Sequence, residues 1–394
     1  MLKSPNSALP LYAVVVAQFF SAFADNALLI VAIVLLKQLG GLDTIPLLQV
    51  FFVIPFIILA PFVGVIADAY AKGRVMLIAN CTKLVGAGLM LLGAPPLLCY
   101  GLAGVGAAAY SPAKYGILSQ LVEPEKLVRA NGLLEGSTIL AILLGVVAGG
   151  YLADIKIDYA FMAVLGAYAL AAGVNLLIPK LVATRPRDSF NIAPLIKEFI
   201  GVARTVWRSA DMRFSLIGTG LFWGTGSTLR LLLFAWVPVA LLITDNQMPS
   251  NLMGAVSLGI VLGAGLAGAM VTLSRVNLAL IGGVLLGPLV IALAYQTTLV
   301  PVVVLLALIG AAGGFFVVPL NALLQDRGHH SVGAGNVLAV QNLVENIGML
   351  TFVGFYALVA KELGIVSIAV GVGLIALVGI GSLAWSRLAI KTRT

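Results

Sequence analysis

The sequence is poor in charged residues. Only 10% of its 394 residues are Asp, Glu, Lys or Arg, whereas 61% are hydrophobic. A soluble globular protein carries about 25% charged residues. The scarcity of charge, together with a mean hydropathy of +1.11, excludes an ordinary soluble domain and predicts a chain that lies mostly in lipid.

Residue types that commonly bind metals or perform catalysis are scarce too. The chain has two cysteines and two histidines. Cys81 and Cys99 lie in apolar stretches without metal-ligand spacing, and His329 and His330 are adjacent in a polar segment. No Gly-rich phosphate loop and no GxSxG or HExxH pattern occurs. We therefore expect no cofactor, no metal site and no catalytic centre.

Long apolar runs account for most of the chain. A bilayer core of about 30 Å needs about 20 apolar residues per helix. The sequence predicts an all-α membrane protein with twelve transmembrane helices, packed closely through its 44 glycines. The predicted spans are 11–36, 45–67, 75–95, 97–119, 131–153, 159–179, 214–242, 250–273, 277–295, 299–324, 332–360 and 363–386.

The positive charges are distributed unevenly between the two sides of the predicted membrane. Of the 23 lysines and arginines, 17 lie in loops and termini on one side, and Lys83, Lys114 and Arg230 fall within predicted spans. The loops of the opposite side hold only Lys37, Lys156 and Lys361. Because positively charged loops stay in the cytoplasm, both termini are predicted to be cytoplasmic. The same bias explains the pI of about 9.5 without a nucleic-acid partner.

The longest polar segment, 180–213, divides the predicted spans into six and six. We interpret it as a cytoplasmic linker whose basic residues also suit anionic headgroups. The sequence therefore predicts an N-terminal half at 1–180, a linker at 181–213 and a C-terminal half at 214–394.

The two halves repeat. Each half contains a segment with the same order of proline, polar residue, glutamine, basic turn and asparagine. The segment is YSPAKYGILSQLVEPEKLVRANGLLE in the first half and VVPLNALLQDRGHHSVGAGNVLAV in the second. A parallel repeat of two pseudo-symmetric six-helix halves resembles the major facilitator fold, in which the substrate site lies at mid-membrane between the halves. The corresponding residues are Pro112 and Pro319, Lys114 and Asn321, and Asn131 and Asn336.

The segment GVIADAYAKGR resembles the superfamily's signature loop between the second and third spans, although two extra residues separate Asp68 from Gly73. By this analogy, Asp68 faces the positive N-terminus of the eleventh span, which begins near Ser331. We expect Asp68 and Arg74 to take part in conformational gating.

Longer blocks between Ala17 and Asn346 carry a narrower resemblance, to the bacterial lysophospholipid transporter family of that superfamily. The blocks cover nearly the whole chain and are more specific than the signature loop. They are AQFFSAFADNALL, PFVGVIADAYAKGRVM, GVGAAAYSPAKYGIL, RANGLLEGSTILAILLG, FWGTGSTLRLLL, GGFFVVPLNALLQDRG and SVGAGNVLAVQNLVEN.

The resemblance implies a flippase rather than an enzyme. Lysophosphatidylethanolamine and lysophosphatidylglycerol would move from the outer to the inner leaflet of the bacterial inner membrane by alternating access. A cytoplasmic acyltransferase/acyl-carrier-protein synthetase would then reacylate them. We expect the transporter to be a monomer.

Ionisable residues inside spans are costly and usually face a cavity or a partner. Asp25 and Arg230 lie near the middle of the first and seventh spans, which flank the central cavity in the superfamily. We therefore expect Asp25 to face Arg230 across the interface of the halves, with Glu345 near. The predicted spans contain Asp25, Lys83, Lys114, Glu135, Arg230 and Glu345.

The other ionisable residues receive different interpretations. Lys114 and Glu135 lie toward the cytoplasmic ends of their spans, where they are expected to pair and line the inner part of the path. Lys83 lies on a span that is peripheral in the superfamily, so we interpret it as structural or as a snorkelling lysine. Asn26 and Asn321 complete the set expected to contact or translocate substrate.

A lysophospholipid headgroup suits these charges. The guanidinium fork of Arg230 matches a phosphate, and Asp25 or Glu345 can balance an ammonium or the arginine. The alternative interpretation is that the charges only tie the halves together. The acyl chain needs apolar walls, although ordinary packing is the other explanation for the aromatic residues concerned. These are Phe19, Phe20, Phe23, Phe222, Trp223, Phe315 and Phe316.

Two other functions remain open at this point. One is a proton-coupled exporter of drugs or small metabolites on the same fold, with Asp25 or Glu345 as the coupling site. The other is a membrane-embedded acyltransferase that uses His329 or His330 with Asp326. The histidines lie inside the repeat described above, which favours transport over catalysis.

Overall fold

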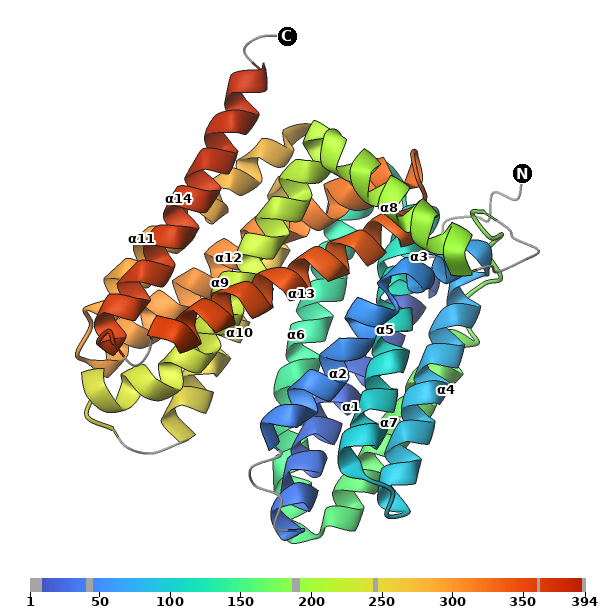
Figure 1. Ribbon diagram of the computed structural model, residues 1–394, viewed down its shortest axis with the longest axis horizontal. Coiled ribbons are helices and arrows are strands. Elements are labelled where there is room, and N and C mark those ends of the chain that lie inside the picture. The colour runs from blue at the N-terminus through green and yellow to red at the C-terminus, as the bar shows by residue number, and fades with distance from the viewer. Residues whose placement is uncertain (1–8, 40–44, 186–191, 244–246, 360–361, 392–394) are drawn as a thin grey trace. The chain divides into compact units, whose positions relative to one another are not determined.

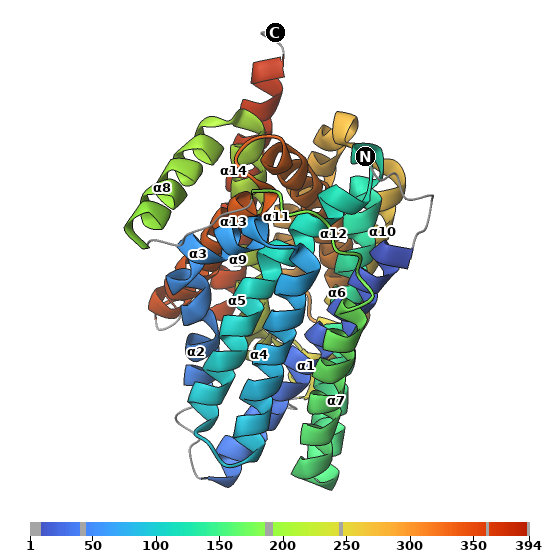
Figure 2. The ribbon, with the colours of Figure 1, turned by 90° about the vertical axis from the view of Figure 1, so that its right-hand side faces the viewer.

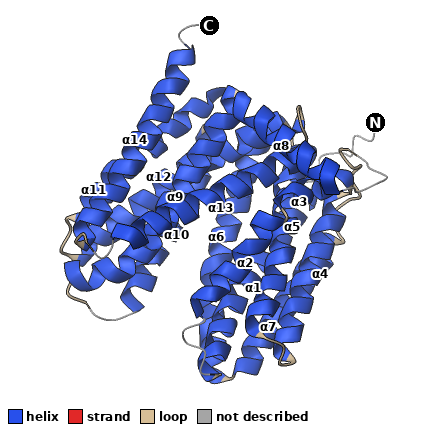
Figure 3. Ribbon diagram, viewed as in Figure 1, coloured by secondary structure: helices blue, strands red, loops and turns tan. Residues whose placement is uncertain are grey.

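The computed structural model describes residues 9–39, 45–185, 192–243, 247–359 and 362–391. These residues form helices joined by short loops (Figure 3). Lys361 and part of the predicted linker lie outside the described residues.

The helices follow one another along the chain with few intervening residues (Figure 1). They are α1 (Leu9–Gln38), α2 (Ile45–Ile58), α3 (Ala60–Ala69), α4 (Lys72–Leu91), α5 (Pro96–Leu121), α6 (Pro124–Ile155), α7 (Ile157–Asn175), α8 (Ile192–Arg208), α9 (Ala210–Ala240), α10 (Gln247–Met270), the 3₁₀ helix η2 (Leu273–Leu278), α11 (Ala279–Ala294), α12 (Leu299–His329), α13 (Ala334–Val359) and α14 (Ile365–Lys391).

Each predicted span coincides with one of these helices or with a consecutive pair of them. Within the described residues, nine helical segments are long and apolar enough to cross a membrane, or ten if α2 and α3 count as one span. The two predicted spans that fall outside this set are α5 and α9.

The second predicted span is bent. Its two parts, α2 and α3, meet at an angle of 62°. Pro61 lies in the first turn of α3, where it has no amide hydrogen and its ring excludes a straight continuation of α2. The helix therefore restarts at Ala60, and α3 ends close to the residues that form the Asp68 site described below.

The chain divides into two compact units. The first unit consists of Met1–Glu123, Leu140–Thr205 and Gln325–Asn342, and the second of Pro124–Ile139, Val206–Leu324 and Leu343–Thr394. The units do not follow the sequence halves throughout, because the start of α6 groups with the second unit and the start of α13 with the first.

In the first unit, α1, α4, α5 and α7 pack side by side (Figure 2). α4 contacts α5 and α7, and α1 contacts the same two helices. Their shared core includes Leu28 and Val31 of α1, Tyr100 of α5, and Val164 and Tyr168 of α7. This packing brings side chains from the middles of α1, α4 and α7 together.

In the second unit, α14 packs against α11 and α9. Gly287 of α11 and Gly373 of α14 allow the two backbones to approach, because a Cβ atom at Gly287 would lie 2.7 Å from the Gly373 carbonyl oxygen. Trp236 of α9 is buried, and its indole nitrogen donates to the Ala294 carbonyl at 3.3 Å.

The predicted linker contains a helix, α8. Its residues Leu195, Val202 and Val206 are buried, whereas Arg204 and Arg208 are exposed. This spacing places the apolar side chains on one face of the helix and the basic ones on another. The linker is therefore an amphipathic element rather than an extended connection.

Candidate functional site

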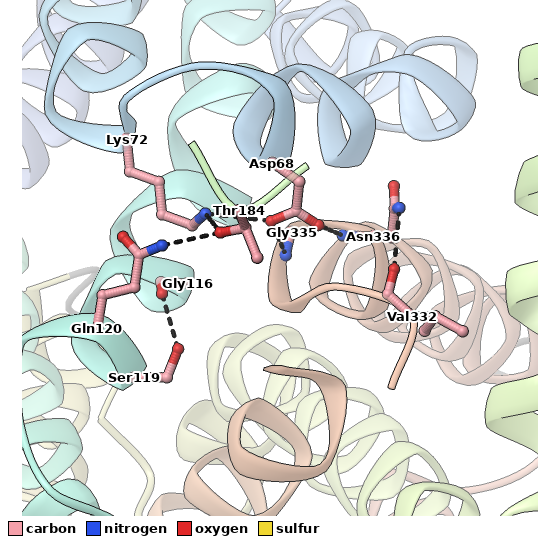
Figure 4. A network of polar contacts seen from close by, with 9 residues as sticks. All are labelled: Asp68, Lys72, Gly116, Ser119, Gln120, Thr184, Val332, Gly335 and Asn336. Atoms are coloured by element: carbon pink, nitrogen blue, oxygen red, sulfur yellow. Dashed lines mark hydrogen bonds and ion pairs between the residues drawn. The ribbon is translucent and has the colours of Figure 1, made fainter. Parts of the chain in front are cut away.

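A buried carboxylate lies where α3 ends and α13 begins. We name the Asp68 cluster for Asp68, Lys72, Gln120, Thr184, Gly335 and Asn336 (Figure 4). Asp68 is 1% exposed. It accepts hydrogen bonds from the backbone amides of Gly335 at 3.0 Å and Asn336 at 3.3 Å. The first amides of a helix lack partners within it and carry positive partial charge. The prediction that Asp68 faces the N-terminus of the eleventh span is confirmed.

Small residues bring α3 and α13 close enough for these bonds. A Cβ atom at Gly64 would lie 2.7 Å from the Cα atom of Asn336 and 2.8 Å from the Gly335 carbonyl oxygen. Gly333 has a φ of +97°, a conformation that favours glycine. The glycines therefore set both the separation of the two helices and the turn that aims the amides at Asp68.

Lys72 is the cationic partner of Asp68. Its ammonium lies 3.1 Å from the Asp68 carboxylate and donates to the Thr184 hydroxyl at 2.9 Å. The Gln120 amide donates to the same hydroxyl at 2.8 Å. Gly116 of α5 leaves room for the lysine, because a Cβ atom there would meet the Lys72 Cε atom at 2.9 Å. Sequence reasoning missed Lys72, Gln120 and Thr184.

The segment after α7 joins this cluster. The Arg185 amide donates to the Asp68 carbonyl at 2.8 Å, and the Arg185 guanidinium donates to the Ser331 carbonyl. Arg74, which the sequence suggested as the basic gating residue, is exposed on α4. The structure therefore places Lys72 rather than Arg74 against Asp68, and the gating role of Arg74 stays a prediction.

A second buried polar cluster lies in the middle of the first unit. We name the Asp25 cluster for Ser21, Asp25, Asn80, Lys83 and Tyr168. The Lys83 ammonium donates to Asp25 Oδ2 at 2.8 Å and the Tyr168 hydroxyl to Asp25 Oδ1 at 2.8 Å. Lys83 also donates to the Ser21 hydroxyl at 2.9 Å, and Ser21 donates to the Asn80 side-chain oxygen at 2.7 Å.

The interpretation of Lys83 as a snorkelling lysine is wrong. Its side chain is 2% exposed and points into the unit toward Asp25. The sequence pattern of α4 did not reveal that Lys83 is buried against Asp25, because this pairing depends on which helices pack against α4. Gly106 of α5 provides the space for the lysine, since a Cβ atom there would lie 2.6 Å from the Lys83 Cγ atom.

Glu135 is buried in the second unit and lies against Asn321. The Asn321 amide lies 3.4 Å from Glu135 Oε1, a long hydrogen bond. These two predicted site residues therefore meet. Lys114 is half-buried, and its ammonium lies 4.5 Å from the centre of the Tyr115 ring. The expected pairing of Lys114 with Glu135 stays a prediction.

The remaining predicted substrate residues are Asn26, Arg230 and Glu345. The Asn26 amide donates to the Ala22 carbonyl of its own helix at 2.8 Å. Arg230 is exposed on α9, and Glu345 is half-buried on α13. Asp25 belongs to the first unit and the other two charges to the second, so their expected meeting stays a prediction.

The aromatic residues separate into two groups. Phe222 and Phe316 are buried, which fits the packing interpretation. Phe19, Phe20 and Phe23 are half-buried on α1 and contact one another, with Phe19 and Phe20 edge to face at 5.4 Å. Trp223 and Phe315 are half-buried as well.

Long apolar helices in two compact units, with ionisable side chains buried within them, define a multi-pass membrane protein of the transport class. The chain belongs to the Major Facilitator Superfamily, whose family model matches residues 14–353.

Relatives that match this chain over most of its length carry the name lysophospholipid transporter. The lysophospholipid transporter LplT of Klebsiella pneumoniae subsp. pneumoniae is 54% identical over 362 residues, which cover 92% of this chain and 91% of that protein. The LplT of Salmonella arizonae is 55% identical over 361 residues, which cover 91% and 90%.

Solved structures agree on the fold. The human organic anion transporter MFSD10 superposes with a TM-score of 0.73 at 16% identity, covering 94% of this chain and 99% of that one. FucP in an outward conformation gives 0.75 at 13% identity, covering 96% and 98%. At such identities the likeness concerns the fold alone.

Proposed function

We propose that this membrane protein transports lysophospholipids across the bacterial inner membrane. The observation that carries the proposal is the 54% identity to a lysophospholipid transporter over 92% of the chain. Such a match leaves little of the chain for a different substrate site.

The substrates we propose are lysophosphatidylethanolamine and lysophosphatidylglycerol. Both carry a phosphate, for which Arg230 has a planar fork of donors. The ethanolamine form adds an ammonium, for which Asp25 and Glu345 are the candidate acceptors. Asp25 supports this role because its side chain is 20% exposed although it lies in the middle of α1.

Further contacts along the route are proposed for two asparagines and for the charges nearer the helix ends. Asn26 and Asn321 offer hydrogen bonds to phosphate or glycerol hydroxyls. Glu135, which lies against Asn321, and Lys114 provide charges of opposite sign. The half-buried phenylalanines of α1 provide an apolar surface for the acyl chain.

The direction we propose is from the outer to the inner leaflet, by alternating access. The bias of lysine and arginine supports cytoplasmic termini, and hence a cytoplasmic position for the Asp68 cluster. A cytoplasmic acyltransferase/acyl-carrier-protein synthetase would reacylate the product. The Asp68 cluster would then act as a gate, because its bonds join α3, α5 and α13 and must break if those helices separate.

The direct test uses the purified protein in liposomes with fluorescent lysophosphatidylethanolamine or lysophosphatidylglycerol, with and without a proton or sodium gradient. We expect lysolipid movement with the protein and none in empty liposomes. Export of drugs or metabolites on a proton gradient, with no lysolipid movement, would refute the proposal.

Arg230 tests the headgroup site. Arg230→Ala should abolish lysolipid transport while the protein still inserts, and Arg230→Lys should restore only part of it, since an ammonium cannot copy the fork. Arg204→Ala is the matched control, because Arg204 is exposed on α8 outside the spans. Full transport by Arg230→Ala would contradict a role in binding the phosphate.

A further inference from the structure

The carboxylate of Asp25 is held by two donors from other helices. Tyr168 of α7 donates to one oxygen and Lys83 of α4 to the other, both at 2.8 Å. The Asp25 side chain is 20% exposed, whereas that of Lys83 is 2% exposed. Asp25 therefore retains accessible surface, while Lys83 lies behind it in the packed interior.

The surroundings of Lys83 are built to hold a buried ammonium. Gly106 leaves space for its stem, and the ring of Tyr110 lies 5.0 Å from its nitrogen, within the range of a cation–π contact. The Ser21 hydroxyl accepts its second hydrogen bond and is itself fixed by Asn80. Since an unpaired ammonium in an apolar interior is costly, these contacts are the ones that a buried lysine needs.

We propose that Lys83 is a positioning residue for Asp25, which holds the carboxylate charged and oriented to receive the ammonium of a zwitterionic lysophospholipid headgroup. The proposal rests on the function proposed above and adds a residue that does not itself contact substrate. Asp25 already has an ion-pair partner, Lys83, within the first unit, so its place in the packed interior does not depend on Arg230.

Removal of Lys83 should therefore act through Asp25. A carboxylate that has lost its cation in an apolar interior tends to take up a proton. Lys83→Met would leave a neutral Asp25 carboxyl group, which is the chemical state that Asp25→Asn imitates. The two substitutions should have the same consequence for a headgroup ammonium.

The first test reads the state of Asp25 without transport. Dicyclohexylcarbodiimide adds to protonated carboxyl groups in apolar surroundings and leaves an N-acylurea, whose mass is located by peptide mass spectrometry. At neutral pH we expect no adduct on Asp25 in the wild type and a clear adduct in Lys83→Met. Lys72→Met, which removes the other buried lysine of α4, should leave Asp25 unlabelled. Equal labelling of Asp25 in all three proteins would overturn the proposal.

The second test measures transport in liposomes. Lys83→Met should lower transport of lysophosphatidylethanolamine by about 10- to 100-fold, the range expected for one charge-assisted hydrogen bond. Lysophosphatidylglycerol, which has no ammonium, should be affected less. The double variant Asp25→Asn/Lys83→Met should be no worse than Asp25→Asn alone. Additive losses in the double variant would show that Lys83 acts independently of Asp25.

Two milder variants protect the test against misfolding. Lys83→Arg keeps the charge and should restore part of the transport and leave Asp25 unlabelled. Tyr168→Phe removes the other donor and should give partial labelling with partial loss of transport. If Lys83→Met does not fold, Lys83→Gln takes its place, and labelling of Asp25 at the wild-type level in that variant would refute the proposal. If the wild type moves no lysophospholipid at all, the proposed function fails, while the labelling result still decides the role of Lys83.

Discussion

Two helix contacts that correspond in the internal repeat differ in their chemistry. In the first unit, Gly64 of α3 lies against α13, where a Cβ atom would come within 2.7 Å of the Asn336 Cα atom. In the second unit, Gly268 of α10 lies against α6, with a corresponding distance of 3.2 Å to the Arg129 Cα atom. The side-chain amides of Asn131 and Asn336 both donate to the carbonyl four residues earlier, at 3.0 and 3.2 Å. The repeat thus places the same glycine-to-helix contact in both units.

Only the first contact contains a buried charge. Four residues after Gly64 comes Asp68, whereas four residues after Gly268 comes the exposed Thr272. The reason lies in the facing helix. α13 begins at Ala334, so its first amides are available to a carboxylate, whereas α6 begins at Pro124 and Asn131 lies well inside it. A carboxylate can accept hydrogen bonds from first-turn amides only where the partner helix begins at the contact. The contact between α10 and α6 therefore consists of packing alone.

Loss of the charge should have the largest effect. Asp68→Asn leaves Lys72 buried without its anion, and breaking one side of a buried pair typically costs about 3–5 kcal/mol. We expect a loss of about 3 kcal/mol in the free energy of unfolding, measured by denaturant titration in detergent micelles. Thr272→Val should change it by less than about 0.5 kcal/mol. Similar losses in the two variants would mean that the charge adds nothing to the contact.

The glycines should come next. Gly64→Ala forces a methyl group against backbone atoms, and overpacking of this kind costs about 1–3 kcal/mol. Gly268→Ala meets its nearest atom at the longer distance of 3.2 Å, so its cost should be under about 1 kcal/mol. The same titration measures both, and Gly88→Ala serves as control because its nearest neighbour lies 4.0 Å away. A larger loss at Gly268 than at Gly64 would reverse the comparison.

Thr184 should have a smaller effect. Thr184→Val keeps the shape but removes the acceptor of the Lys72 and Gln120 hydrogen bonds, for which we expect a loss of about 1 kcal/mol. Thr205→Val is the control, because Thr205 is exposed and its hydroxyl donates to the Gly201 carbonyl of the same helix. Equal stability of the two variants would indicate that the segment after α7 does not strengthen the Asp68 cluster.

The smallest effect is expected from adding the missing acid. Thr272→Asp should change the free energy of unfolding by less than about 0.5 kcal/mol, because α6 presents no first-turn amide at this contact. If the variant were instead stabilised by as much as a favourable helix-dipole contact, up to about 1–2 kcal/mol, our explanation of the asymmetry would be wrong.

Much of the fold could be predicted from the sequence. Apolar runs of membrane length located the helices, and the repeat gave the superfamily. The resemblance to the superfamily's signature loop placed Asp68 against the start of α13, because the analogy supplied the long-range partner and the acidic residue suited the start of a helix. The bend between α2 and α3 was not anticipated, although Pro61 was its visible cause.

The partners of the buried charges could not be predicted in the same way. Lys83 was assigned to the periphery because its span is peripheral in the superfamily, and Asp25 was paired with Arg230 by analogy between spans. Which helices pack against α4 is a long-range property, so the contacts with Asp25 and Tyr168 appeared only in the structure. The glycine of α5 that faces each buried lysine could likewise be recognised only in the structure.

The two buried lysines of α4 fix the number of residues that can separate them along the helix. Lys72 and Lys83 are eleven residues apart, about three helical turns, and each lies over a glycine of α5, Gly116 or Gly106. One residue inserted between them would rotate one lysine by about 100° relative to the other and move it away from both its glycine and its aspartate. Insertions and deletions should therefore be tolerated in the loop after α4 but not between its two lysines, where the number of residues matters as much as their identity.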